Sequence, residues 1–89
     1  MMTTIEISMY PLEADYKPAI RQFIHDIRSL PNIRTVTNQM NTQITGEFDV
    51  VVPGLNACMK KTMSECDKVV FVTKFINAEL DIESAPDLV

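Results

Sequence analysis

Two helical repeats alternate with four strand patterns along this chain, and that order constrains its fold more than any other feature. Strand patterns are short runs of β-branched residues or of alternating apolar and polar residues, whereas helical patterns place apolar residues three and four positions apart. The order strand, helix, strand, strand, helix, strand predicts a ferredoxin-like α+β fold. In this βαββαβ arrangement, a four-stranded antiparallel sheet carries both helices on one face. The strands are expected at 3–10, 33–38, 42–47 and 68–76, and the helices at about 15–30 and 48–65.

The two helices are expected to begin at acidic residues and to bury one apolar stripe each. Asp15 is the predicted N-cap of the first helix, and the sequence LPN at 30–32 ends it because the residue before a proline avoids helical angles. Asp49 is the predicted N-cap of the second helix. Pro53 weakens the first turn, so segment 50–52 has an extended conformation as an alternative. The stripes comprise Ala19, Ile20, Phe23, Ile24, Ile27 and Leu30 in the first helix, and Val51, Leu55, Cys58, Met59, Thr62 and Met63 in the second.

The sheet face without helices is expected to be covered by a second subunit. The last strand, VVFVTKFI, is apolar in both of its alternating sets, which is typical of a central strand packed on two sides. One helix layer covers only one set, and monomers seldom leave such an apolar surface in water. We therefore expect the first and last strands to be central, and a homo-oligomer, a dimer or tetramer, to form sheet against sheet. Glu6, Ser8 and Tyr10 alternate with apolar residues in IEISMYPL and would lie on this covered face.

Composition and charge exclude several classes of function. The 89 residues suit one domain, expected at 1–78, and an acidic tail at 79–89 that is either disordered or placed on a neighbouring subunit. A net charge of −4 and a pI near 4.7 argue against nucleic-acid binding, which needs clustered Lys and Arg. No apolar run reaches the roughly 18–20 residues of a membrane span, and no signal peptide is recognised. Cys58 and Cys66 lack metal-site spacing and indicate reduced thiols in a cytoplasmic protein.

No catalytic or metal-binding constellation is evident in the sequence. His25 is the single histidine, and no serine, cysteine or aspartate pattern marks it as part of a triad. With only two glycines, the chain has no glycine-rich phosphate loop. We therefore expect no catalytic residue, no metal and no cofactor.

Two segments together resemble the YkoF-like thiamine-binding family. The first is IEISMYPL at 5–12, and the second, beyond the first helix, is TNQMNTQITGEFD at 37–49. Members of that family typically open with a strand of the form E-x-S-x-Y-P and carry M-x-T-x-I-x-G in the hairpin. The last strand, with Lys74, also fits, so the resemblance spans residues 4–77. The matching positions are Glu6, Ser8, Tyr10 and Pro11, then Met40, Thr42, Ile44 and Gly46.

The resemblance implies a ligand-binding protein rather than an enzyme, with thiamine or its hydroxymethylpyrimidine moiety as ligand and assembly through sheet faces and edges. It places ligand contacts on Glu6 and Ser8 and around the hairpin, although family members often have a glutamate where this chain has Thr45. If Val36 and Ile44 face the helices, strict alternation turns the hairpin contacts away from Glu6 unless a bulge intervenes. These hairpin contacts are Asn38, Met40 and Thr42.

The residues suit recognition of an aminopyrimidine, which presents an amino donor beside a ring-nitrogen acceptor. Glu6 accepts from the amino group, and Met40 offers the ring a polarizable surface. Two alternatives remain. One is a small enzyme of the dimeric α+β barrel type, with a deep cavity between sheet and helices and His25 or Glu6 as base. The other is a regulatory module that binds a different protein through the apolar face and the acidic tail.

Overall fold

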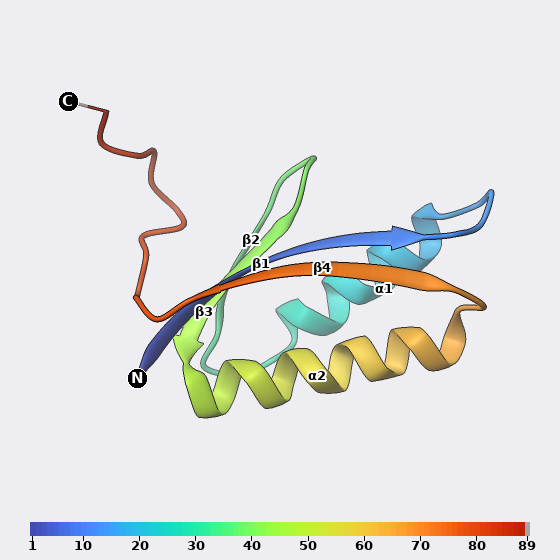
Figure 1. Ribbon diagram of the computed structural model, residues 1–89, viewed down its shortest axis with the longest axis horizontal. Helices are drawn as coiled ribbons and strands as arrows, with labels where there is room; N and C mark the ends of the chain where they lie inside the picture. Colours follow the sequence, from blue (N-terminus) through green and yellow to red (C-terminus); the bar gives the residue numbers. More distant parts are fainter. Residues whose placement is uncertain (89) are drawn as a thin grey trace.

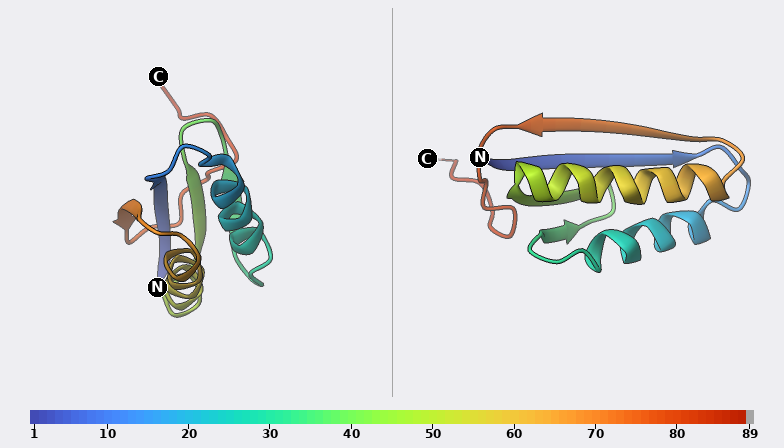
Figure 2. Two further views of the ribbon diagram at one scale, coloured as in Figure 1. Left: turned by 90° about the vertical axis from the view of Figure 1, so that its right-hand side faces the viewer. Right: turned by 90° about the horizontal axis from the view of Figure 1, so that it is seen from below.

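Six elements follow one another in the order that the sequence predicts, in a computed structural model that describes residues 1–88. The four strands form one antiparallel sheet in the order β2-β3-β1-β4. Both helices cover the same face of that sheet (Figures 1 and 2), so the predicted ferredoxin-like α+β fold is confirmed. The elements are β1 (Met2–Pro11), α1 (Lys17–Arg28), β2 (Arg34–Thr37), β3 (Thr42–Glu47), α2 (Phe48–Glu65) and β4 (Val69–Ile76).

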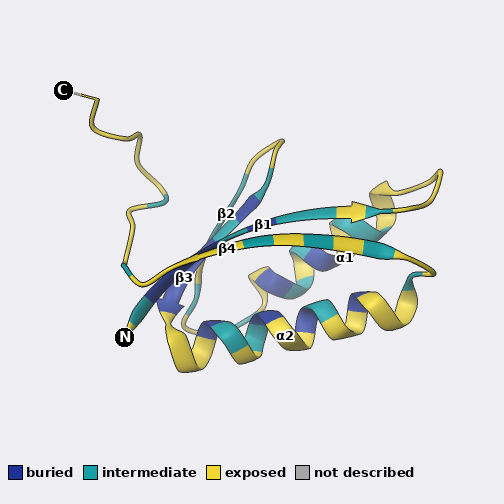
Figure 3. Ribbon diagram, viewed as in Figure 1, coloured by how far each residue is buried: buried dark blue, intermediate teal, exposed yellow. Residues whose placement is uncertain are grey.

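β4 is an edge strand, so its predicted central position is wrong. β3 of the hairpin pairs with one edge of β1, and β4 pairs with the other edge, with Ser8 opposite Val72. No strand lies beyond β4 among the described residues. The apolar residues on both faces of β4 therefore have different surroundings. One set turns toward the helices, whereas Val70, Val72 and Ile76 are exposed on the other face. Intermediate and exposed residues alternate along much of β4 (Figure 3).

The core lies between the sheet and the helices. Ile5 and Ile7 of β1 are buried there, and Ile44 of β3 pairs with Ile5 and points the same way. The rings of Phe23 on α1 and Phe71 on β4 pack with their centroids 5.1 Å apart. The remaining fully buried apolar side chains are Ile27, Val51, Leu55 and Cys58, all from the predicted helix stripes.

α1 begins later than predicted, with Tyr16 rather than Asp15 at the N-cap. No side chain caps the helix, but Pro18 lies in the first turn, where a proline ring presets a helical φ and its missing N–H is not needed. The helix ends at Arg28, close before Pro31. The prediction of Asp15 as N-cap is wrong, because the helix begins with a proline in its first turn and has no side-chain cap.

α2 is one continuous helix through residues 50–52, so the extended alternative is wrong. The helix starts at Phe48, which moves Asp49 from the predicted cap into the first turn. The Phe48 N–H donates to the carbonyl of Met1 at 2.9 Å, which satisfies one of the N–H groups that every helix start leaves free. Met63, predicted in the buried stripe, is 53% exposed.

The beginning of the C-terminal tail lies against the chain's own sheet, although the tail was expected to be disordered or to lie on a neighbouring subunit. The hydroxyl of Thr4 on β1 donates to the carbonyl of Ala78 at 2.8 Å and accepts from the N–H of Leu80 at 3.1 Å. These contacts hold the beginning of the tail next to the sheet. Val89, the last residue of the tail, lies outside the described residues.

One ion pair joins the two helices. Nζ of Lys61 on α2 lies 2.9 Å from Oδ2 of Asp26 on α1, and Gln22 donates to Oδ1 of Asp26, also at 2.9 Å. Burial by itself raises the pKa of Asp26, but the bonds from Lys61 and Gln22 outweigh burial and hold this pKa below its usual value. A carboxyl group whose pKa falls on folding stabilises the fold above its unfolded pKa, and this stabilisation is lost as the pH falls through the folded pKa.

We expect Lys61→Met to lower the free energy of unfolding at pH 7 by a small amount, because the ion pair with Asp26 lies near the surface. The difference from the unaltered chain should disappear at pH values well below 3.8, where Asp26 is protonated in both folded chains. Urea unfolding of both chains, at pH 7 and at a pH well below 3.8, measures the difference in the free energy of unfolding. Lys60→Met, on an exposed position next to it, should change neither value. A loss that persists in acid would contradict the ion pair as its cause.

Candidate ligand-binding site

The helix-free face of the sheet, called the open face below, combines polar residues in its centre with apolar residues along β4. The pairing register defines which side chains share this face, because directly opposite residues point the same way. On β1 and β3 the register brings together Thr4 with Thr45 and Glu6 with Gln43. The other open-face positions include Ser8 and Tyr10 on β1, Arg34 and Val36 on β2, and Val70, Val72, Lys74 and Ile76 on β4.

Glu6 lies at the centre of this face and is held from two sides. Its Oε2 accepts a hydrogen bond from Nδ2 of Asn41 at 2.9 Å, and its Oε1 lies 3.6 Å from Nζ of Lys74. The Glu6 side chain is 36% exposed, so the carboxylate is oriented by the protein and still reachable. A fixed, charged acceptor of this kind is suited to bind a donor group on a small molecule.

A shallow pocket of about 320 Å³ adjoins Glu6 and is called the Glu6 pocket below. Its polar side is formed by Glu6, Gln43 and Lys74, and its apolar side comes from the end of β4 and the segment beyond it. The amide of Gln43 stands beside the carboxylate and supplies both a donor and an acceptor. The remaining lining residues are Thr4, Phe75, Ile76 and Leu80.

Several of these residues were missed when the sequence was considered alone. Asn41 lies between the two expected strands of the hairpin, and the bond from its side chain to Glu6 spans 35 positions of sequence. Gln43 had a usable signal, because alternation from Ile44 places it on the face opposite to the core. Leu80 lies in the tail and had no signal, since nothing in the local pattern says where the tail docks.

Ser8 and the hairpin residues do not gather around Glu6 in one pocket. Ser8 lies two positions along β1 on the open face, opposite Val72. Thr42 points toward the helices, is 5% exposed, and has its hydroxyl 3.1 Å from that of Thr37. The pairing of β3 with both neighbours is continuous, so the bulge that would turn Thr42 toward Glu6 is not present. Val36 does not face the helices, as had been assumed, because its strand partner Gln43 places it on the open face.

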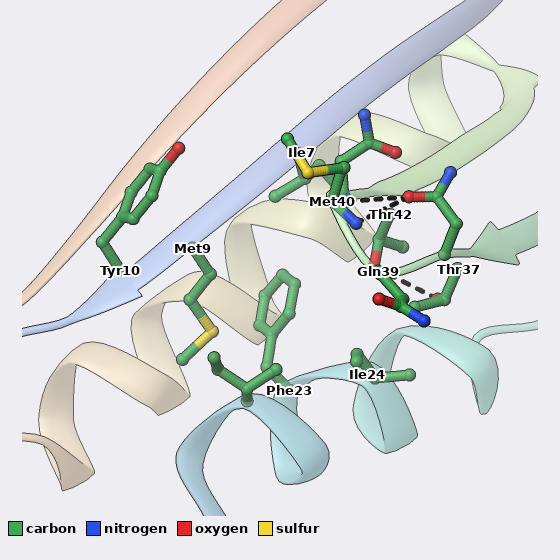
Figure 4. A pocket seen from close by; sticks show the side chains of 12 residues that line it. Ile7, Met9, Tyr10, Phe23, Ile24, Thr37, Gln39, Met40 and Thr42 are labelled. Atoms are coloured by element: carbon green, nitrogen blue, oxygen red, sulfur yellow. Dashed lines mark hydrogen bonds between the residues drawn. The ribbon is translucent and has the colours of Figure 1, made fainter. Parts of the chain in front are cut away.

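Asn38, Met40 and Thr42 instead line a second space, about 300 Å³, between the hairpin and α1 (Figure 4). We call it the hairpin cavity. Oδ1 of Asn38 accepts from the backbone N–H of Met40 at 2.8 Å and of Asn41 at 3.1 Å, so the side chain is used to form the turn. The Met40 side chain is 84% exposed at the tip. The apolar walls include Ile7, Met9, Ile20, Phe23 and Ile24.

Neither proposed catalytic base lines the hairpin cavity. His25 is exposed on α1, and Glu6 lies on the opposite face of the sheet. Tyr10 is the one titratable residue among those that line the cavity, and the register places its side chain on the open face. Within residues 1–88, no group of three or more potential metal ligands comes together, and no helix is both long and apolar enough to cross a membrane.

Comparisons with known proteins find similarity at the level of structure. No protein-family model matches the chain, and a search of curated proteins finds no match. A solved protein from Streptococcus pneumoniae is 24% identical, with a TM-score of 0.82, over 93% of this chain and 94% of that one. A domain of unknown function, DUF77, from Bacillus cereus is 17% identical, with a TM-score of 0.74, over 88% and 77% of the two chains.

A third solved structure carries a functional description. This Thermotoga maritima protein, provisionally described as a thiamine biosynthesis/salvage protein, is 18% identical, with a TM-score of 0.81, over 93% of this chain and 92% of that one. Sequence identities this low establish a shared fold, whereas function depends on the residues that each chain presents on it. The chain described here therefore has the fold of these proteins, and its function has to be argued from its own site.

Proposed function

We propose that this protein binds thiamine or its hydroxymethylpyrimidine moiety without converting it chemically, in the Glu6 pocket on the open face. The observation that carries the proposal is the half-buried carboxylate of Glu6, oriented by Asn41 and set beside an apolar wall. The resemblance of the first strand and the hairpin to YkoF-like proteins supports it. The description of the Thermotoga maritima protein points to the same ligand class.

The pocket chemistry matches an aminopyrimidine. Glu6 accepts from the amino group, while the Gln43 amide donates to the adjacent ring nitrogen, so both polar atoms of the ligand edge find partners. Ile76 and Leu80 form an apolar surface for the ring. A volume of about 320 Å³ lies at the lower end of the roughly 300–1,000 Å³ typical of small-molecule pockets. A site that pairs both atoms discriminates strongly against rings that lack either one.

The hairpin residues have an indirect role in this proposal. Asn38 forms the turn that presents Asn41 to Glu6, and Thr42 fixes the strand that carries Gln43. Ser8 extends the polar strip of β1 beyond the pocket.

Lys74 provides a test that separates the two ligands. Thiamine carries a positive thiazolium ring, whereas hydroxymethylpyrimidine is neutral at pH 7, and Lys74 competes with a cation for Glu6. We expect Lys74→Met to tighten thiamine binding about two- to fivefold, which is the size of an exposed charge interaction, and to leave hydroxymethylpyrimidine binding unchanged. Isothermal titration calorimetry measures both, with Lys60→Met as control. If neither thiamine nor hydroxymethylpyrimidine at millimolar concentration produces heat with the unaltered chain, the proposed function is rejected.

We also propose that a second copy of the chain covers the part of the open face beyond the pocket. Val70, Val72 and Tyr10 are exposed side by side there, and β4 has no partner on its outer edge among residues 1–88. Apolar strand edges of this length normally pair or are protected. The resulting assembly would be a dimer or a tetramer, built with two-fold symmetry.

Val72→Asp is expected to reduce this assembly to a monomer of 10.1 kDa, because it places a charge in the centre of the apolar contact. Light scattering coupled to gel filtration measures the mass. Met63→Asp on α2 is the matched control, since Met63 and Val72 are almost equally exposed. A monomeric unaltered chain at concentrations of about 100 μM, where specific interfaces are normally formed, would contradict the assembly.

A further inference from the structure

The C-terminal residues 78–83, called the strap below, cross the open face of their own molecule from β4 toward β2. We propose that the strap is a lid that forms one wall of the Glu6 pocket, anchored at Thr4 and latched by Arg34. Whether the strap is latched is independent of the ligand, while its effect on affinity rests on the proposed function. Three sets of contacts carry the inference.

The anchor is the hydroxyl of Thr4. It donates to the carbonyl of Ala78 at 2.8 Å, accepts from the N–H of Leu80 at 3.1 Å, and lies 3.0 Å from the hydroxyl of Thr45. Thr4 is 5% exposed and Thr45 is 1% exposed, although both lie on a face that no helix covers. Burial of two hydroxyls in such a position requires hydrogen-bond partners, and the strap supplies two of them.

The latch is Arg34 on β2, at the opposite edge of the sheet from β4. Its Nε lies 3.5 Å from Oε1 of Glu83, and its Nη2 lies 3.9 Å from Oδ1 of Asp81. Together with the anchor, these ion pairs attach the strap to β1 and β2, so it spans the sheet. Because both pairs are largely exposed, salt weakens the latch and leaves the buried anchor less affected.

The wall is the side chain of Leu80, which lines the Glu6 pocket together with Ile76. Leu80 follows the anchor point directly, since its own N–H is bonded to Thr4. Release of the strap would therefore remove the apolar wall and expose Thr4 at the same time. The pocket is complete only when the strap is docked.

Amide hydrogen exchange of Leu80, measured by NMR on the full chain, tests the latch without any ligand. We expect exchange at this amide to be about three- to tenfold faster in Arg34→Met than in the unaltered chain, because the loss of two exposed ion pairs favours local opening. Arg28→Met, which removes the same charge from α1, should leave it unchanged. Raising the salt concentration should accelerate exchange in the unaltered chain and have little effect in Arg34→Met. Equal protection in the two chains, or no protection in the unaltered chain, would overturn the proposal.

Calorimetry with thiamine tests the wall. Leu80→Ala is expected to weaken thiamine binding about three- to tenfold, from the apolar surface that the ligand no longer buries. Leu88→Ala, at an exposed position further along the tail, is the control and should bind as the unaltered chain does. Unchanged affinity in Leu80→Ala would reject the lid. If the unaltered chain binds neither thiamine nor hydroxymethylpyrimidine, the proposed function fails, and the hydrogen-exchange result still decides the latch.

Discussion

The Glu6→Ala variant is expected to bind thiamine about 10- to 150-fold more weakly than the unaltered chain. A hydrogen bond to a charged group contributes about 1.5–3 kcal/mol, and each 1.4 kcal/mol is a factor of ten in affinity. The substitution also removes the partner of the Asn41 amide and leaves Lys74 to repel the thiazolium charge. Isothermal titration calorimetry at pH 7 measures the loss.

Two further variants separate charge from shape. Glu6→Gln keeps the size of the side chain and one acceptor, so its loss should be smaller for the neutral hydroxymethylpyrimidine than for thiamine. Glu65→Ala removes a carboxylate at the end of α2, remote from the pocket, and should bind normally. A thermal melt of each variant shows whether it is folded. Glu6→Ala with unaltered affinity would place the ligand elsewhere.

Phe23→Ala is expected to lower the free energy of unfolding by about 3–5 kcal/mol, the usual cost of removing a buried ring and leaving a cavity. Phe23 is almost fully buried, packs against Phe71, and forms part of the wall of the hairpin cavity. Because small domains have total stabilities of about 5–15 kcal/mol, the variant should be close to unfolding at 37 °C. Urea titration followed by circular dichroism measures it. A loss below about 1 kcal/mol, typical of surface positions, would contradict the described core.

Phe23→Leu then distinguishes the two pockets. It removes fewer atoms from the core, keeps the chain folded and widens the hairpin cavity. We expect its affinity for thiamine to be unchanged, whereas Ile76→Ala, which removes apolar surface from the Glu6 pocket, should weaken binding. The reverse result would assign the ligand to the hairpin cavity, beside Asn38 and Thr42.

Local sequence patterns were sufficient for the elements of the fold and for one part of the site. Helical spacing identified Phe23 and Leu55 as core residues, and strand alternation placed Ile5 in the core with Glu6 on the other face. These features depend on neighbours within about one turn or two strand positions, so periodicity alone predicts them. Capping was less well predicted, because Pro18 made a side-chain cap unnecessary.

Tertiary structure decided the features that depend on contacts between distant segments. It placed the apolar strand β4 at an edge, and it paired β3 continuously, without the bulge that would have turned Thr42 toward Glu6. It also brought Asn41 to Glu6, across 35 positions of sequence. It brought Leu80 to the same pocket, where the Leu80 N–H is bonded to Thr4 across 76 positions. Alternation says which face a side chain takes, but strand order and docking of the tail depend on which long-range contacts are jointly possible, and no local repeat encodes those.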